Sequence, residues 1–237
     1  MKSKSVSSKV IEVCELDKNS IENMYKLFSK YFVSKKETFI EDLNEKDYVI
    51  IIRNSRNDNI IGFSSIEYIN LPLNNENIKI IYSGDTIVDE NFRNESDLLK
   101  IFVNFNLQKL SNENEIYWYL ISMGFRTYRF LPVFFKEFWP RYDNDTPSKI
   151  KKIIDSLGKM KFENQYLNDK GIIVQETECY LRTPYVDIPN SRLKNPHIKF
   201  FLEKNPGYIK GNELACLTKF SLNNFKPIIF KRFDIDY

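Results

Sequence analysis

Glycine is scarce in this sequence, which carries 7 glycines among 237 residues. Average usage of roughly 7% would give more than twice that number. Loops that cradle phosphate groups usually need glycine, and neither a P-loop nor a dinucleotide-binding fingerprint occurs. Histidine is scarcer still, with His197 alone, and the three cysteines form no C-x-x-C pair. These shortages exclude a zinc site of the usual spacing, and we expect no metal ligands.

An excess of charge of one sign and long apolar runs are also missing. The 35 basic and 32 acidic residues are spread along the chain, so the composition does not favour a nucleic-acid-binding protein with a clustered basic face. No stretch approaches the ~20 apolar residues that a membrane helix needs, and no apolar signal-peptide core follows the basic first residues. Together with three free thiols, this predicts a cytoplasmic protein without membrane contact.

Aromatic residues are plentiful, at 15% of the chain, and supply much of the apolar area for a core. Apolar alternation predicts strands, and apolar residues at three- and four-residue steps predict helices. The expected strands are 10–16, 48–53, 60–69, 78–88, 116–122, 172–181 and 213–220, and the expected helices are 17–32, 38–43, 96–110 and 148–160.

This order of elements predicts an α/β (α+β) fold with a mixed, mostly antiparallel central sheet flanked by helices. We expect a disordered leader over residues 1–9 and the main domain over 10–140. Residues 141–237 form a C-terminal extension that either completes the sheet or makes a small subdomain. Asn195-Pro196-His197 is typical of a turn.

The most specific pattern is the stretch from Tyr82 to Arg93, YSGDTIVDENFR. Val88 and Arg93 lie five residues apart, and aromatic Phe92 precedes the arginine. With IIGFSSIEYI upstream, this stretch resembles the central strand and following turn of the GCN5-related N-acetyltransferase (GNAT) superfamily, whose pattern is V-x-P-x-x-R-x-x-G-x-G. The resemblance covers residues 10–140. It implies an acyl-CoA-dependent N-acyltransferase with acetyl-CoA as cosubstrate and a small-molecule or protein amine as acceptor.

The resemblance also implies where coenzyme A would bind. In the family, backbone N–H groups at the N-terminus of the next helix approach the pyrophosphate, aided by the helix dipole. The implied cofactor-binding residues are Thr86, Ile87, Val88, Arg93, Asn94 and Ser96. The sequence departs from the pattern where Glu90 replaces the proline and where Ser96 and Leu98 replace the two glycines. Leu98 crowds the approach, and the neighbouring acidic residues Glu95 and Asp97 repel phosphate.

Acyl transfer in the family needs an oxyanion donor and a proton acceptor. Gly84, inside the central strand, predicts a bulge or a close backbone approach, and its alternative is a tight packing point. The family splays this strand from the next, so the segment from Asp85 to Val88 would offer its amides to the ligand. Asp85 and Glu67, both on core strands, are the candidates for accepting the proton of the amine through water, and either would equally suit an exposed sheet face.

The leaving thiolate needs a proton donor, for which the family often uses a tyrosine after the fifth strand. Tyr128, in GFRTYRFLP, is the nearest match. The alternative interpretation is that Tyr128 is a core aromatic residue whose hydroxyl reaches water. Arg126 and Arg129 flank Tyr128. They either hold a CoA phosphate or an acidic substrate, or form a solvated helix face.

Two other functions stay open on the sequence. The missing glycines favour a degenerate GNAT-fold binding or scaffold protein, which would have an occluded cleft. The basic helix from Lys149 to Lys161 would suit a nucleic-acid-binding module if its lysines formed a contiguous surface.

Overall fold

An eight-stranded mixed sheet runs through the computed structural model, which describes residues 6–73, 76–93, 97–113, 115–176 and 178–233. The strand order is β1-β3-β4-β5-β6-β10-β8-β7, and neighbouring strands are antiparallel except for the parallel pair β5–β6. The expected mixed, mostly antiparallel sheet is therefore confirmed. Its strands are β1 (Val6–Glu12), β3 (Tyr48–Asn54), β4 (Ile60–Leu73), β5 (Glu76–Val88), β6 (Ile116–Ser122), β7 (Tyr166–Leu167), β8 (Ile172–Ile173) and β10 (Glu213–Lys219).

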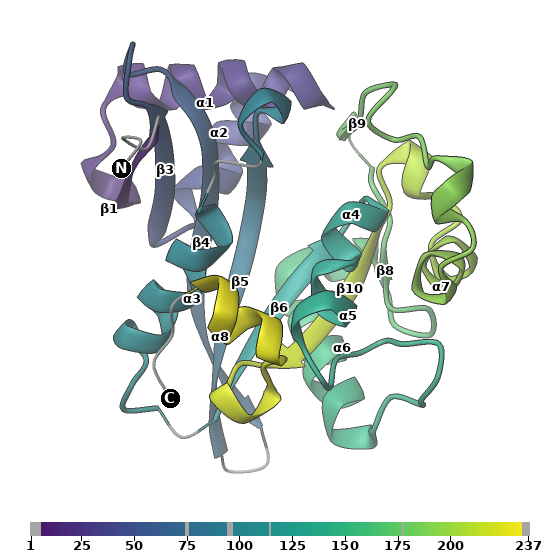
Figure 1. The fold of residues 1–237 in the computed structure, drawn as a ribbon. Coiled ribbons are helices and arrows are strands. Elements are labelled where there is room, and N and C mark those ends of the chain that lie inside the picture. Colours follow the sequence, from purple (N-terminus) through teal and green to yellow (C-terminus); the bar gives the residue numbers. More distant parts are fainter. Residues whose placement is uncertain (1–5, 74–75, 94–96, 114, 177, 234–237) are drawn as a thin grey trace.

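Helices cover both faces of this sheet (Figure 1). Alternation within the strands supplies the two apolar faces: in β3, Val49 and Ile51 pack against α1 and α2, whereas Ile50 packs in the core on the opposite face. One face carries α1 (Lys18–Tyr31), α2 (Lys36–Asn44) and α6 (Ser148–Phe162). The other carries α3 (Leu98–Lys109), α4 (Phe125–Tyr128), α5 (Phe130–Phe134), α7 (Pro196–Lys204) and α8 (Pro227–Phe233).

Helix α1 shows how local sequence produces these elements. Asp17 is its N-cap, and the Asp17 carboxylate accepts a hydrogen bond from the Ser20 backbone N–H at 2.6 Å. Met24, Leu27, Phe28 and Tyr31 then recur at three- and four-residue steps and are all buried. This stripe packs onto β3 and β4, as the periodicity predicts.

Three segments differ from expectation. Strand β1 begins at Val6, so residues 6–9 of the expected leader belong to the sheet; residues 1–5 lie outside the described part. The single strand expected over 172–181 is wrong, because β8 joins the main sheet while β9 (Tyr180–Leu181) pairs with β2 (Phe32–Val33). The expected turn at Asn195 is instead a helix start, where the Asn195 side chain caps α7.

The residues after 140 are part of the same sheet, since they supply β7, β8 and β10. Within the described residues, every helix is too short or too polar to cross a membrane.

Strands β5 and β6 separate toward their C-terminal ends (Figure 1). Their pairing ends at Ser83 and Leu120, whereas β6 continues alongside β10 to Ser122. On the other edge of β5, Thr86 pairs with Ser64 and Ser83 pairs with Ile66, so Ser65 alone lies opposite Gly84 and Asp85. The bulge predicted at Gly84 is confirmed. A bulge bends a strand and increases its twist, which directs the end of β5 away from β6.

The bulge requires glycine because the neighbouring atoms leave no room for a side chain. A Cβ at Gly84 would lie 2.5 Å from the Ser65 Oγ and 2.9 Å from the Lys46 Cε. The Ser65 Oγ is itself buried, and it has no hydrogen-bond partner among the described residues.

We predict that Gly84→Ala lowers the free energy of unfolding by about 1–3 kcal/mol, the range for overpacking a buried site. Ser65→Ala removes the closest of these atoms together with an unpartnered buried hydroxyl, so alone it should be nearly neutral. The double variant should recover part of the free energy of unfolding that Gly84→Ala loses. Urea unfolding of the wild type, both single variants and the double variant would measure this. Equal losses with and without Ser65→Ala would contradict the steric explanation.

Candidate active site where two strands separate

Two cavities meet where β5 and β6 separate, and they share seven lining residues, Thr86 and Met123 among them. The first, of about 470 Å³, lies between the end of β5, α3 and α4 and is called the basic cavity below. The second, of about 350 Å³, reaches α2, β10 and the end of α6 and is called the acidic cavity. Because their walls are shared, the two cavities form one opening that passes between the separated strands.

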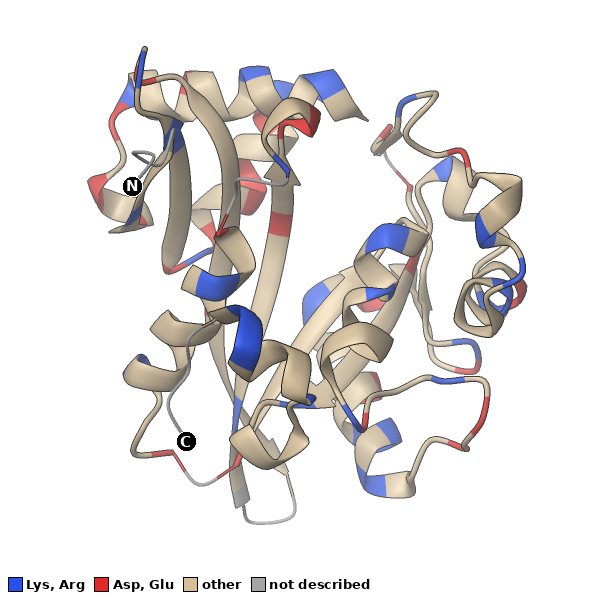
Figure 2. Ribbon diagram, viewed as in Figure 1, with Lys and Arg blue, Asp and Glu red and all other residues tan. Residues whose placement is uncertain are grey.

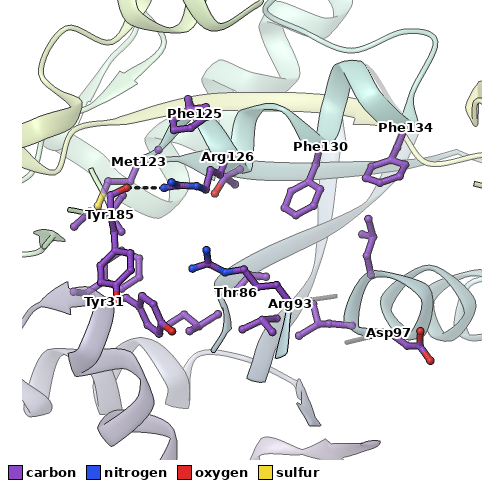
Figure 3. A pocket seen from close by; sticks show the side chains of 18 of the residues that line it. Tyr31, Thr86, Arg93, Asp97, Met123, Phe125, Arg126, Phe130, Phe134 and Tyr185 are labelled. Carbon is purple, nitrogen blue, oxygen red and sulfur yellow. Dashed lines mark hydrogen bonds between the residues drawn. The ribbon is translucent and has the colours of Figure 1, made fainter. Parts of the chain in front are cut away.

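The basic cavity is lined by four cationic side chains, from Arg93, Lys100, Arg126 and Arg232, and by one carboxylate, Asp97, among the described residues. Figure 2 shows basic residues on α4 and on α8. Arg93 and Arg126 come from opposite walls (Figure 3).

Contacts within the protein hold two of these arginines. The Arg93 guanidinium lies 5.8 Å from the centre of the Tyr31 ring, and Arg126 donates a hydrogen bond to the Tyr185 carbonyl at 2.7 Å. Burial, with the nearby positive charges of Arg93 and Arg192, lowers the pKa of Arg126. Such crowding of like charges is relieved when a polyanion binds between them.

The predicted cofactor residues of β5 lie on this cavity. Thr86, Ile87 and Val88 line it together with Arg93, so the structure brings these four together. Beyond Ser83, the described part of the chain places no strand against the edge of β5 that faced β6. An extended ligand with amide groups could pair with that edge, as an added strand would. Asn94 and Ser96, the remaining predicted residues, lie outside the described residues.

The acidic cavity is lined by three carboxylates, Asp42, Asp85 and Glu213. Asp42 accepts a hydrogen bond from Lys46 Nζ at 2.8 Å, and the Lys46 side chain is fully buried. Asp85 follows Gly84 in the bulge. Glu213, at the start of β10, is 9% exposed and has no hydrogen bond or ion pair within the described part of the chain.

The carboxyl groups of Asp85 and Glu213 both have pKa values above the ordinary range. Burial raises the pKa of Asp85 to about 8; the Asp42 charge raises it further, and Lys46 opposes both. Burial also raises the pKa of Glu213 to about 8, with a further contribution from the charges of Asp85 and Asp42. The two groups therefore titrate as a pair near neutral pH, where a general base is most useful.

The other two predicted catalytic residues lie elsewhere. Both carboxylate oxygens of Glu67 accept hydrogen bonds from Lys161 Nζ at 3.0 Å, and Lys46 Nζ lies 3.7 Å away. Tyr128 is fully buried, donates a hydrogen bond to the Pro140 carbonyl at 2.9 Å, and has a pKa raised by burial. Neither residue lines either cavity, so the structure does not bring them to Asp85.

Sequence reasoning missed Glu213. Its only signal is a carboxylate at the first position of an otherwise apolar strand, ELACLTK, which also describes an ordinary solvated strand end. Only the packing of β10 beside the separated strands reveals that this position is buried.

The helix with the basic sequence, α6, has much of its charge paired. Lys149 contacts Glu115 at 2.9 Å, Lys151 contacts Asp155 at 2.8 Å, and Lys161 contacts both Glu45 and Glu67. Within the described residues, no group of three or more His, Cys, Asp and Glu side chains is placed to hold a metal ion.

No protein-family model and no curated protein matches this sequence. Among solved structures, the chain is similar to Saccharomyces cerevisiae N-myristoyltransferase with bound myristoyl-CoA, at 15% identity and a TM-score of 0.40 over 48% of this chain and 29% of the yeast chain. It is similar to an Escherichia coli GNAT family N-acetyltransferase in complex with CoA, at 13% identity and a TM-score of 0.40 over 55% and 69%. It is also similar to Arabidopsis thaliana NAA60 in complex with acetyl-CoA, at 12% identity and a TM-score of 0.40 over 59% and 92%.

We predict that Asp85→Asn stabilises the protein in a pH-dependent way. Because the folded state raises the pKa of this carboxyl, the free energy of unfolding of the wild type falls as the pH rises from about 4 to about 8. The amide removes that loss, so the variant should be more stable by roughly 0.5–2 kcal/mol at pH 8.5 and nearly unchanged at pH 5.

Denaturant unfolding at both pH values measures this difference. Asp169→Asn, at an exposed turn position, is the control and should change stability by less than about 0.5 kcal/mol at either pH. A stabilisation by Asp85→Asn that is equal at pH 5 and 8.5 would contradict the ionisation argument.

Proposed function

We propose that this protein transfers the acyl group of an acyl-CoA to an amine. The observation that carries the proposal is the single opening between β5 and β6, with a cation-lined cavity at one end and a carboxylate-lined cavity at the other. A transferase of this kind must hold a polyanionic donor and a cationic acceptor on opposite sides of one reacting carbon. The charges along the opening match that requirement.

The basic cavity fits coenzyme A in its chemistry. Coenzyme A carries its phosphates at one end and, at the other, an extended arm that contains amides and ends in the thiol. Arg93 and Arg126 would bind the phosphates by charge-assisted hydrogen bonds, with Lys100 and Arg232 adding positive charge. The unpaired edge of β5 from Thr86 to Val88 would pair with the amides of the arm and direct the thioester toward Gly84 and Asp85.

Transfer first requires the cationic acceptor to lose one proton, which gives the nitrogen a lone pair. The nitrogen then attacks the thioester carbon, the carbon–sulfur bond breaks, and the nitrogen loses its second proton to solvent. Asp85 lines the acidic cavity next to Thr86, which lines both cavities, and we assign Asp85 as the group that accepts the first proton, directly or through a water. Its raised pKa suits this role, because a more basic carboxylate accepts a proton more readily at neutral pH. The thiolate leaves with CoA and takes a proton from solvent.

Glu213 would assist Asp85 as a positioning residue. While Asp85 is ionised, the charge of Asp85 keeps Glu213 protonated, so the pair presents one negative charge to the amine. The structure offers no comparable support for Glu67 or Tyr128, whose side chains are bonded outside the cavities.

A binding protein that had lost coenzyme A is the alternative left by the missing glycines. It would have an occluded cleft, whereas both cavities here have room for ligand. The open cleft therefore favours the transferase. The three free cysteines support a reducing location such as the cytoplasm, which we propose for the reaction.

We expect acetyl-CoA to bind and Arg93→Ala to weaken that binding about tenfold or more, since a hydrogen bond to a charged group contributes about 1.5–3 kcal/mol. Calorimetric titration of both proteins with acetyl-CoA and with free CoA measures the effect. Arg56→Ala, in an exposed turn outside both cavities, is the matched control and should leave affinity unchanged. Absence of binding to the wild type at millimolar ligand would refute the proposal.

We expect Asp85→Asn to lower kcat by about 10²–10⁴, the usual contribution of a general base, without a large change in acetyl-CoA affinity. Glu213→Gln keeps the shape of the neutral carboxyl and should lose less. The wild-type rate should rise with pH toward and above 8, because Asp85 must be ionised to act.

Rates of thiol release from pH 6 to 9.5 test the assignment. The Asp85→Asn profile retains the titration of the amine itself and so separates it from that of Asp85. A greater loss in Glu213→Gln than in Asp85→Asn would make Glu213 the base instead.

A further inference from the structure

We infer that the acceptor is a primary amine with a single positive charge on an apolar body about the size of an aromatic ring. This inference rests on the proposed function and narrows it to one class of acceptor, bound in the acidic cavity.

The part of the acidic cavity lined by Asp85 and Glu213 suits one ammonium group. Glu213 is nine-tenths buried, lines the cavity and has no hydrogen-bond or ion-pair partner within the described residues, so a ligand ammonium would give its carboxyl group a partner. It shares this end with Asp85, and mutual repulsion lets the two carry about one negative charge between them. The third carboxylate, Asp42, is already bonded to the buried Lys46.

Aromatic side chains form part of the remaining lining of the acidic cavity. Phe28, Phe39 and Tyr82 are buried and line the cavity, and Phe32 and Phe162 are partly exposed beside them. These rings come from α1, α2, β2, β5 and α6. Rings attract an ammonium over their faces and pack against an apolar body, so both parts of such an amine gain contacts.

Polyamines and sugar amines match this cavity less well. A second ammonium would lie against phenyl rings with no unpaired carboxylate to neutralise it, which is costly in a buried site. Several hydroxyls that could bind a sugar are already engaged: Ser64 bonds Thr86 at 2.7 Å, and Ser83 accepts a hydrogen bond from the Trp118 indole at 2.9 Å.

The test compares three amines at fixed acetyl-CoA: 2-phenylethylamine, spermidine and glucosamine. The kcat/KM for 2-phenylethylamine should exceed that for each of the others at least tenfold. Phe162→Ala should lower kcat/KM for 2-phenylethylamine about threefold to tenfold, mainly through KM, since an aromatic contact is worth ~0.5–1.5 kcal/mol.

Two controls separate this inference from the proposed function. Tyr142→Ala removes an exposed ring outside both cavities and should leave kcat/KM unchanged. Calorimetry of acetyl-CoA reports the donor side alone, and Phe162→Ala should leave that affinity unchanged.

Each other outcome has a definite meaning. If spermidine or glucosamine is the better acceptor, or if acetyl-CoA binds but none of the three amines is acylated, the inference is overturned while the proposed donor site stands. If octanoyl-CoA binds much more tightly than acetyl-CoA and Phe162→Ala abolishes that gain, the rings hold the acyl chain, and the inference is again overturned. If acetyl-CoA does not bind at all, the proposed function itself fails.

Discussion

The extra residue in β5 at Gly84 and Asp85 is the feature on which the rest of the site depends. Two residues of β5 share one partner, Ser65, and the close approach of Ser65 and Lys46 leaves no room for a side chain at Gly84. The resulting bend ends the pairing between β5 and β6 at Ser83 and turns Asp85 into the acidic cavity. One backbone irregularity thus creates the opening and places a carboxylate in it.

The opening separates charge of opposite sign. Arginines and a lysine line one end, carboxylates line the other, and the apolar and aromatic walls between them keep the local dielectric low. The network of Lys46 and Lys161 with Asp42, Glu45 and Glu67 lies beside the acidic end. Burial has the largest effect on the pKa values of Asp85 and Glu213. The Asp42 charge raises both pKa values, the Asp85 charge raises that of Glu213, and Lys46 lowers that of Asp85.

Segments far apart in the chain meet in this arrangement. The acidic end combines Asp42 from α2, Asp85 from β5 and Glu213 from β10, and the basic end adds Arg232 from α8. The residues after 140 therefore complete the sheet and also supply a charged group to each end of the opening. A site assembled this way depends on the whole fold.

The alternating and helical apolar patterns were sufficient to predict most of the elements. The stripe of α1, the strands around β3, β4 and β5, and the mixed sheet follow from periodicity, because burial of one face acts on residues close together in sequence. The irregularity at Gly84 could also be predicted, since a glycine inside a strand indicates a bulge or close approach. Short elements stabilised by distant partners, such as β9 on β2, were not, because no local pattern encodes their pairing.

For the site, the sequence by itself singled out the β5 edge and Arg93, and it offered Asp85 and Glu67 equally as candidates for the base. Tertiary structure alone decided that Glu67 is bonded to Lys161, that Tyr128 is enclosed in the core, and that Glu213 faces the opening. A side chain's ionisation and access depend on which groups surround it, and a contact such as that of Glu67 with Lys161, 94 residues apart, leaves no periodic trace in the chain. The sequence therefore determines which side chains can carry charge, whereas the fold decides whether that charge is paired, buried or available to a ligand.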